Sequence, residues 1–239
     1  MVRLAIDLIL RRDRPISRYD GRLRRLVRVA SSHLVLQTAL LAIAFTTGGR
    51  AEDMAISKHD FQAKLDYCKT CHGASGQGFH AFNPIPRLAG QQTEYLENQL
   101  QAFTEHRRTN NIMFNVAHVL TPAMEKALVT YFHELNPKPV GGAPKELVAV
   151  GRKLFEEGIP SGNVPPCATC HGADAKGNGQ IPRLAGQLSD YIFNKLTNWD
   201  KERGQNRAAP DTSAIMEPIA HGLTESQIKA VAAYVSYLE

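Results

Sequence analysis

The chain has 239 residues, of which 43% are hydrophobic, and its formal net charge is +5. The charge is unevenly distributed, because residues 1–51 hold ten Lys or Arg and three Asp or Glu, and the remaining residues hold 18 basic and 20 acidic side chains. The positive charge thus belongs to the amino-terminal segment alone, so the composition does not indicate a nucleic-acid partner.

Residues 1–51 have the layout of an export signal. A basic region extends to Arg28, an apolar stretch spans Leu34 to Phe45, and small residues follow up to Ala51. The apolar stretch is shorter than the ~20 residues that a membrane span needs, and we predict cleavage after Ala51. An uncleaved leader that associates the protein with the membrane is the alternative. In both cases the folded part is expected in the periplasm.

The pentad Cys-x-x-Cys-His occurs twice and accounts for all four cysteines of the chain. Its members are Cys68, Cys71 and His72 in the first copy and Cys167, Cys170 and His171 in the second. The pattern is typical of haem attachment, in which two thiols bond to the haem vinyl groups and the adjacent histidine binds the iron. Three other uses of four cysteines fit less well. Two disulfides would not explain the histidine after each pair, and a redox dithiol usually occurs once in a chain. A zinc knuckle needs its two cysteine pairs closer together. We therefore predict two covalently bound haem c groups.

An internal repeat surrounds the two pentads. The string Ile-Pro-Arg-Leu-Ala-Gly-Gln follows the first pentad at residues 85–91 and the second, unchanged, at residues 181–187. A helix is predicted after each string, with the hydroxyl residues Thr93 and Ser189 as N-caps and an acidic residue in the first turn. The spacing from pentad to string is three residues shorter in the second copy, so the loops around the two haems are expected to differ.

A terminal amphipathic helix is predicted to close each repeat, starting after Thr121 in the first and after Thr224 in the second. Its apolar residues are Leu128, Tyr131, Phe132 and Leu135 in the first repeat and Val231, Ala232, Val235 and Leu238 in the second. Pro and Gly are frequent in the connecting residues 138–143, which are predicted to be a linker. We therefore expect two helical domains, residues 52–137 and 144–239, each too small to bury a large core without its haem.

The repeat also predicts the second iron ligand. Met113 and Met216 occupy equivalent positions, each five residues before a matched histidine, His118 or His221. Five residues of a helix are a rotation of roughly 140°, so a methionine and its matched histidine should not both face the haem. We favour the methionines, which raise the reduction potential and leave no open coordination position, and ligation by two histidines is the alternative. Met124 has no methionine at its equivalent position and is expected to pack within a helix.

Over residues 55–239 the chain resembles the di-haem class I cytochromes c of the c-four type. The paired Cys-x-x-Cys-His-Gly sites, the paired Pro-Arg-Leu-Ala-Gly-Gln strings and the two late methionines carry the likeness. The resemblance implies an all-α fold of two tandem class I cytochrome c domains, each wrapped around one covalently bound haem. It also implies that the carbonyl groups of Pro86 and Pro182 accept hydrogen bonds from the axial histidines.

The same resemblance assigns further residues to the haem pockets. Leu88 and Leu184 would pack on the haems, and Arg87 and Arg183 would lie near the haem propionates, although both arginines are equally well interpreted as exposed. Three aromatic residues would line the haem pockets or merely pack in the core, namely Tyr95, Tyr191 and Trp199.

These features predict an electron carrier of a respiratory chain, with one electron per His/Met-ligated haem and no catalytic residue. Its donor would be a quinol-oxidising complex or a dehydrogenase, and its acceptor a terminal oxidase or reductase. A cytochrome subunit of a periplasmic dehydrogenase is an alternative with the same cofactors. A di-haem peroxidase is a further alternative, which requires one iron with an exchangeable ligand.

Overall fold

The computed structural model describes residues 56–203 and 212–239. The chain divides into two units, residues 1–54 and 55–239, and all of the described residues belong to the second. The predicted export signal, its cleavage after Ala51 and the alternative of an uncleaved anchor all lie outside the described residues. Among the helices that are described, none is both long and apolar enough to cross a membrane.

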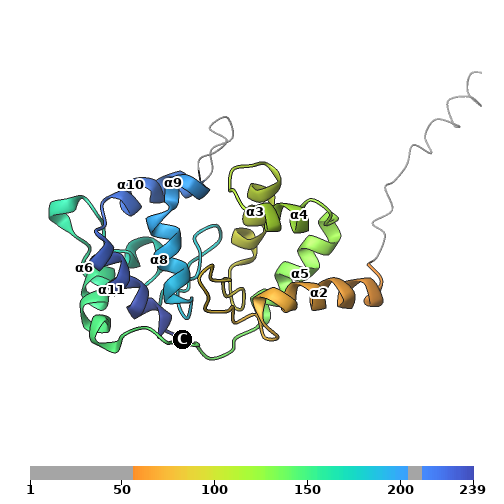
Figure 1. Ribbon diagram of the computed structural model, residues 1–239, viewed down its shortest axis with the longest axis horizontal. Helices are drawn as coiled ribbons and strands as arrows, with labels where there is room; N and C mark the ends of the chain where they lie inside the picture. The colour runs from red at the N-terminus through yellow and green to blue at the C-terminus, as the bar shows by residue number, and fades with distance from the viewer. Residues whose placement is uncertain (1–55, 204–211) are drawn as a thin grey trace, which may run out of the picture. The chain divides into compact units, whose positions relative to one another are not determined.

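Four α-helices form the first half of the described fold, residues 56–137 (Figure 1). They are α2 (Lys58–His72), α3 (Thr93–Thr104), α4 (Asn111–Ala117) and α5 (Pro122–Glu134). The first of these ends at the histidine of the first pentad. The backbone N–H of the next residue, Gly73, donates to the carbonyl of Lys69, and Gly73 has φ 87°, which favours glycine.

The second half, residues 144–239, has the same order of elements with more short helices. They are η1 (Lys145–Leu147), α6 (Val148–Glu157), η2 (Pro160–Gly162), α7 (Ala168–His171), α8 (Ser189–Thr197), α9 (Trp199–Glu202), η3 (Thr212–Ile215), α10 (Met216–His221) and α11 (Glu225–Ser236). Within residues 56–203 and 212–239 the extended backbone forms only isolated bridges and no strand. The prediction of an all-α fold is therefore confirmed.

The predicted starts of the terminal helices are confirmed by their caps. The Thr121 hydroxyl accepts from the backbone N–H of Met124. Thr224 and Gln227 form a complete capping box, in which each side chain accepts from the backbone N–H of the other residue.

The predicted N-caps at the repeat strings are wrong by one residue. The N-cap of α3 is Gln92 and that of α8 is Leu188, and neither side chain caps its helix. Thr93 is the first helical residue instead, and its hydroxyl donates to the carboxylate of Glu94. Each helix therefore begins two residues after the Gln that ends its string, and no hydroxyl group caps it.

Each half has its own cluster of buried apolar residues. The cluster of the first half contains Leu65, Leu96, Leu128, Val129 and Phe132. The cluster of the second half contains Phe155, Ala175, Ala185, Ile192, Val231, Ala232 and Val235. The terminal helix α5 contributes its predicted apolar face to the first cluster, with Tyr131 and Leu135 at the margin, and α11 contributes its predicted apolar face to the second, with Leu238 at the margin.

The second half is closed by a tight crossing of α6 and α11 (Figure 1). A Cβ atom added at Gly151 would lie 1.9 Å from the carbonyl oxygen of Ala230, so the two backbones touch at this glycine. One turn further on, Phe155 is fully buried and its ring lies 5.5 Å from that of Tyr234. The crossing fixes the helix that precedes the second pentad.

Candidate haem-binding sites

The two pentads are held in the same local conformation by different elements. In the first half, Cys68 and His72 lie one turn apart near the end of the long helix α2. In the second half, residues 158–167 separate α6 from the short helix α7, and Cys167 is the N-cap of α7. The backbone N–H of His171 donates to the carbonyl of Cys167 over 2.9 Å. Each histidine is therefore one helical turn from the first cysteine of its pair.

All four cysteines are free thiols, so the disulfide interpretation is not supported. Cys68 and Cys167 are half-buried, and burial raises the pKa of both thiols. Cys71 and Cys170 are exposed. One thiol of each pair thus lies against the protein core and the other is open to solvent, an arrangement that allows two bonds to the edge of one planar group.

Both pentad histidines are buried and oriented by a backbone carbonyl. The Nδ1 atom of His72 donates to the carbonyl of Pro86 over 2.9 Å, and that of His171 donates to the carbonyl of Pro182 over 2.9 Å. The hydrogen bonds that the resemblance implied are therefore present. Burial lowers the pKa of both imidazoles, with the proline carbonyls acting in the opposite direction. A neutral ring protonated on Nδ1 leaves Nε2 as the atom that binds iron.

The candidate methionines lie on equivalent short helices. Met113 is half-buried in the first turn of α4, where its backbone N–H donates to the side chain of Asn110. Met216 is half-buried at the first position of α10. Met124, by contrast, lies in the first turn of α5 and packs against the core cluster of the first half. The packing role of Met124 is confirmed, and iron ligation by Met113 and Met216 stays a prediction.

The competing histidines are exposed and engaged elsewhere. The Nδ1 atom of His118 donates to the carbonyl of Phe114 over 3.0 Å, and its ring stacks on that of Phe114 with the centroids 5.2 Å apart. The Nε2 atom of His221 lies 2.9 Å from the carboxylate of Asp200. These contacts do not turn either ring toward the pentad of its own half. The geometry therefore does not support ligation of an iron by two histidines.

The arginines of the repeated strings are buried, which excludes the interpretation that they are exposed. Arg87 is 3% exposed and Arg183 is 7% exposed. Each Nε atom donates to the backbone carbonyl two residues further on, at Ala89 and Ala185 respectively. Burial, together with the nearby charge of Arg183, lowers the pKa of Arg87 to about 10. A buried cation of this kind indicates a nearby anion.

Each of these arginines has a further N–H donor that could bind such an anion. In the described part of the chain, Nη1 of Arg87 and Nη2 of Arg183 are buried without a hydrogen-bond partner. Native proteins rarely leave such groups unsatisfied, and haem propionates are anions that would accept from them. The pentad thiols, the Nδ1-protonated histidines and these orphaned donors are together the groups that a covalently attached haem requires, so the residues fit one haem in each half.

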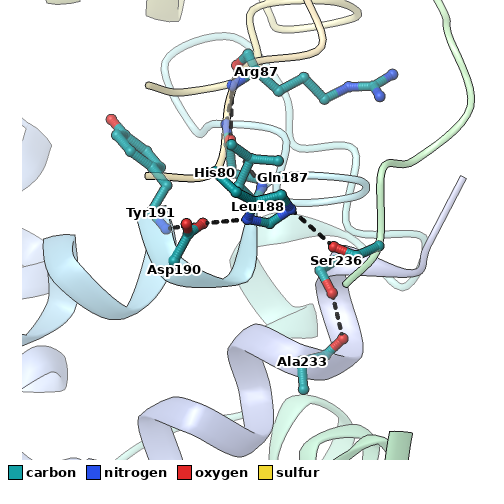
Figure 2. A network of polar contacts seen from close by, with 9 residues as sticks. His80, Arg87, Gln187, Leu188, Asp190, Tyr191, Ala233 and Ser236 are labelled. Atoms are coloured by element: carbon teal, nitrogen blue, oxygen red, sulfur yellow. Dashed lines mark hydrogen bonds and ion pairs between the residues drawn. The ribbon is translucent and has the colours of Figure 1, made fainter. Parts of the chain in front are cut away.

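Two glutamines at the ends of the strings join the halves, a role that the sequence alone did not indicate. The Oε1 atom of Gln91 accepts from the backbone N–H of Arg183 over 2.7 Å, and its Nε2 atom donates to the carbonyl of Arg183 over 3.0 Å. Gln187 makes the same pair of bonds to Arg87, over 2.9 and 3.0 Å, and Figure 2 shows its side chain beside the Arg87 backbone. The identity of the two strings was the signal that they form a reciprocal contact.

A second reciprocal contact involves aromatic residues that the resemblance assigned to the haem pockets or the core. The guanidinium of Arg108 donates to the hydroxyl of Tyr191 over 2.7 Å, and that of Arg203 bonds to Tyr95. Arg203 also lies over the ring of Trp199, 5.4 Å from its centroid. The aromatic residues therefore contact arginines, and the sequence analysis did not single out either arginine.

Further polar contacts connect the linker and the two halves. His80, on the loop after the first pentad, lies beside Asp190 (Figure 2), with Nδ1 3.0 Å from its carboxylate. The Nε2 atom of His80 lies 3.1 Å from the carbonyl of Gly141. The Nε2 atom of Gln92 donates to the carbonyl of Lys176 over 2.9 Å. The linker and both halves are thus bound to one another by polar groups of the loops around the two pentads.

Comparison with known proteins agrees with this geometry. The profile of the cytochrome c family matches residues 61–138 and again residues 148–239. The chain is 36% identical to a cytochrome c-552 of Acidithiobacillus ferridurans over 87% of its own length and 88% of that protein. It is 34% identical to a protein of Thiomonas intermedia named thiosulfate dehydrogenase electron acceptor, over 71% of the chain and 77% of that protein.

The solved structures give the same result. The cytochrome c4 of Acidithiobacillus ferrooxidans is similar with a TM-score of 0.62 and 36% identity, covering 72% of this chain and 99% of that one. The chain belongs to the cytochrome c family, as a di-haem member of the c4 type. Its two tandem domains accordingly bind two covalently attached haem c groups, and the protein is an electron carrier. The exact domain boundaries, 52–137 and 144–239, stay predictions.

Proposed function

We propose that both haem irons are six-coordinate, bound by His72 and Met113 in the first domain and by His171 and Met216 in the second. The observation that supports this most directly is the orientation of the two buried histidines, whose Nδ1 atoms donate to proline carbonyls and leave Nε2 for the metal. The contacts of His118 and His221 with Phe114 and Asp200 support methionine as the opposite ligand.

Such coordination makes each haem a carrier of one electron and leaves no position for a substrate at the iron. The thioether ligand stabilises the ferrous state and raises the reduction potential. The protein chain supplies orientation and burial: the proline carbonyls hold the proximal rings, and the string arginines meet the propionates. No residue is assigned the role of acid, base or nucleophile, and we propose that the protein has no enzymatic activity.

We place this carrier in the periplasm, with a quinol-oxidising complex or a dehydrogenase as its donor and a terminal oxidase or reductase as its acceptor. The export-signal layout of residues 1–51 supports the location. Relatives that include an electron acceptor of thiosulfate dehydrogenase support a redox protein as the partner, and a periplasmic dehydrogenase in particular as a donor.

The same relative favours a second candidate function, that of a permanent cytochrome subunit of such a dehydrogenase. Size-exclusion chromatography of the native protein from its own cells separates the two. A free carrier elutes as a small protein whose mass matches the chain with its two haems. Co-elution with a larger catalytic subunit, resistant to salt, would replace the free-carrier proposal by the subunit.

A di-haem peroxidase is distinguished by the coordination of the iron. We expect the reduced protein not to bind carbon monoxide on mixing, because both axial positions are occupied by side chains. Rapid formation of a carbon monoxide complex, together with a high-spin ferric haem in the protein as isolated, would establish an exchangeable ligand and support the enzyme instead. Absorption spectra before and after addition of the gas are the measurement.

A further inference from the structure

Each proximal histidine is connected to the other domain through a single peptide group. The carbonyl of the Pro86–Arg87 peptide accepts from His72, and the N–H of the same peptide donates to Oε1 of Gln187. The Pro182–Arg183 peptide is used in the same way, by His171 at its carbonyl and by Gln91 at its N–H. Two short hydrogen-bonded chains therefore cross between the domains in opposite directions.

We propose that Gln91 and Gln187 are positioning residues that tune the haem of the opposite domain: Gln187 acts on the haem of His72, and Gln91 on the haem of His171. This inference rests on the proposed axial role of those two histidines. An acceptor at the N–H of a peptide polarises that peptide and makes its carbonyl a stronger acceptor. A stronger acceptor at Nδ1 makes the imidazole a better donor to iron, which stabilises the ferric state.

The surroundings favour such an effect. Gln91 and Gln187 are 5% and 6% exposed, and the two arginines whose backbone N–H groups they accept from are buried as well. Hydrogen bonds in a buried site of low dielectric are electrostatically stronger than in water. Each Oε1 atom also accepts from the next backbone N–H of its own chain segment, at Gln92 and Leu188, over 2.9 and 3.0 Å. The amides are therefore held in place before an electron arrives.

The experiment compares Gln187→Met and Gln91→Met in the full-length protein with both haems. Methionine keeps the approximate volume and removes the acceptor. In Gln187→Met the Fe(III)/Fe(II) equilibrium of the first haem should move toward the ferrous form by about two- to threefold, and a one-electron couple changes by 59 mV per tenfold. The second haem should stay unchanged. In Gln91→Met the second haem should shift toward the ferrous form and the first haem should stay unchanged.

Gln92→Met is the matched control, because it removes a hydrogen bond between the domains, to Lys176, that involves neither proline peptide. It should move neither redox step. A second variant, Gln187→Glu, keeps an oxygen acceptor and gives it negative charge, so the first haem should shift in the direction opposite to that in Gln187→Met. Loosening of the interface alone would move the potential in the same direction in both variants.

A local readout completes the test and does not depend on electron-transfer activity. In the ferrous protein, which is diamagnetic, the proton NMR signal of His72 Nδ1–H should move upfield in Gln187→Met, and that of His171 should stay in place. Equal shifts of both haems in each variant, or shifts in Gln92→Met as large as those in Gln91→Met, would overturn the proposal. Failure of the proposed ligation appears separately, as a high-spin spectrum of the unmutated protein.

Discussion

At the scale of single residues, the assignment of the iron ligands depends on what each histidine contacts. The pentad histidines are buried and donate through Nδ1 to proline carbonyls, and the late histidines His118 and His221 are exposed and contact Phe114 and Asp200. A histidine that binds a metal normally donates its other ring N–H to a carbonyl or carboxylate, as the two pentad histidines do. The assignment of methionine as the opposite ligand therefore follows from matched positions in the repeat together with the engagement of the competing histidines.

We predict that Met113→Ala and Met216→Ala each remove one methionine-linked absorption band near the red end of the ferric spectrum. Loss of the thioether should also lower the reduction potential of the haem concerned, because the ferrous state loses its preferred ligand. Absorption spectra of the oxidised proteins measure the effect. Each single variant should lose about half of the band intensity, since the two haems contribute one band each.

Met124→Ala, His118→Ala and His221→Ala are the controls for these variants. All three should retain the full band, because Met124 packs against the core of the first domain and the two histidines are exposed. A band that disappears in Met124→Ala would show that the alignment of the repeats is mistaken. A band that appears only after removal of His118 or His221 would show that histidine is the native ligand.

Motif residues could be predicted from the sequence because covalent attachment requires fixed chemistry at fixed spacing. The contacts of Pro86 and Pro182 followed from the resemblance and are present. The roles of Gln91 and Gln187 could not be derived, because a polar residue in a loop acquires a partner only from the fold of the other domain. The burial of the string arginines was left open for the same reason.

At the scale of elements, the second domain depends on the crossing of α6 and α11 more than the sequence indicated. Apolar periodicity predicted the buried face of α11, but it does not report how closely two helices approach. The close approach occurs at Gly151, where the carbonyl of Ala230 occupies the space that a side chain would fill. The segment that joins α6 to the second pentad, residues 158–166, was likewise not anticipated, because it precedes the motifs on which the repeats were aligned.

We predict that Gly151→Ala destabilises the second domain by about 1–3 kcal/mol, the range expected for overpacking. The added methyl group meets backbone rather than a flexible side chain, so the helices must separate. Alanine favours an isolated helix over glycine, and a net loss of stability therefore reports the crossing itself. Denaturant unfolding followed by circular dichroism measures the change.

Gly162→Ala is the control in the same domain, because its nearest neighbour would be 3.5 Å from the added Cβ atom, an ordinary contact. It should change the free energy of unfolding by less than about 1 kcal/mol. Equal effects of the two substitutions would contradict the close approach of α6 and α11.

At the scale of the whole molecule, two small cores are joined by polar contacts between the domains. The glutamine exchange between the strings and the arginine–tyrosine exchange between Arg108, Tyr191, Arg203 and Tyr95 are both reciprocal. An interface built in this way connects the haem environments directly.

The all-α class and the duplication were available from the sequence, because helix periodicity and a repeated string are local patterns. The short helices of the second domain and the contacts between the domains were not, since they depend on loops of unequal length. The three-residue difference between pentad and string did indicate that the two haem loops differ.

The central claim is that both haems are low-spin, ligated by histidine and methionine, and exchange one electron each. A redox titration of the purified protein, with absorption spectra of the oxidised and reduced states, tests it most directly. We expect two one-electron steps, low-spin spectra throughout, and the methionine-linked band at an intensity corresponding to both haems. A high-spin ferric haem, a single redox-active haem, or the absence of that band would contradict it.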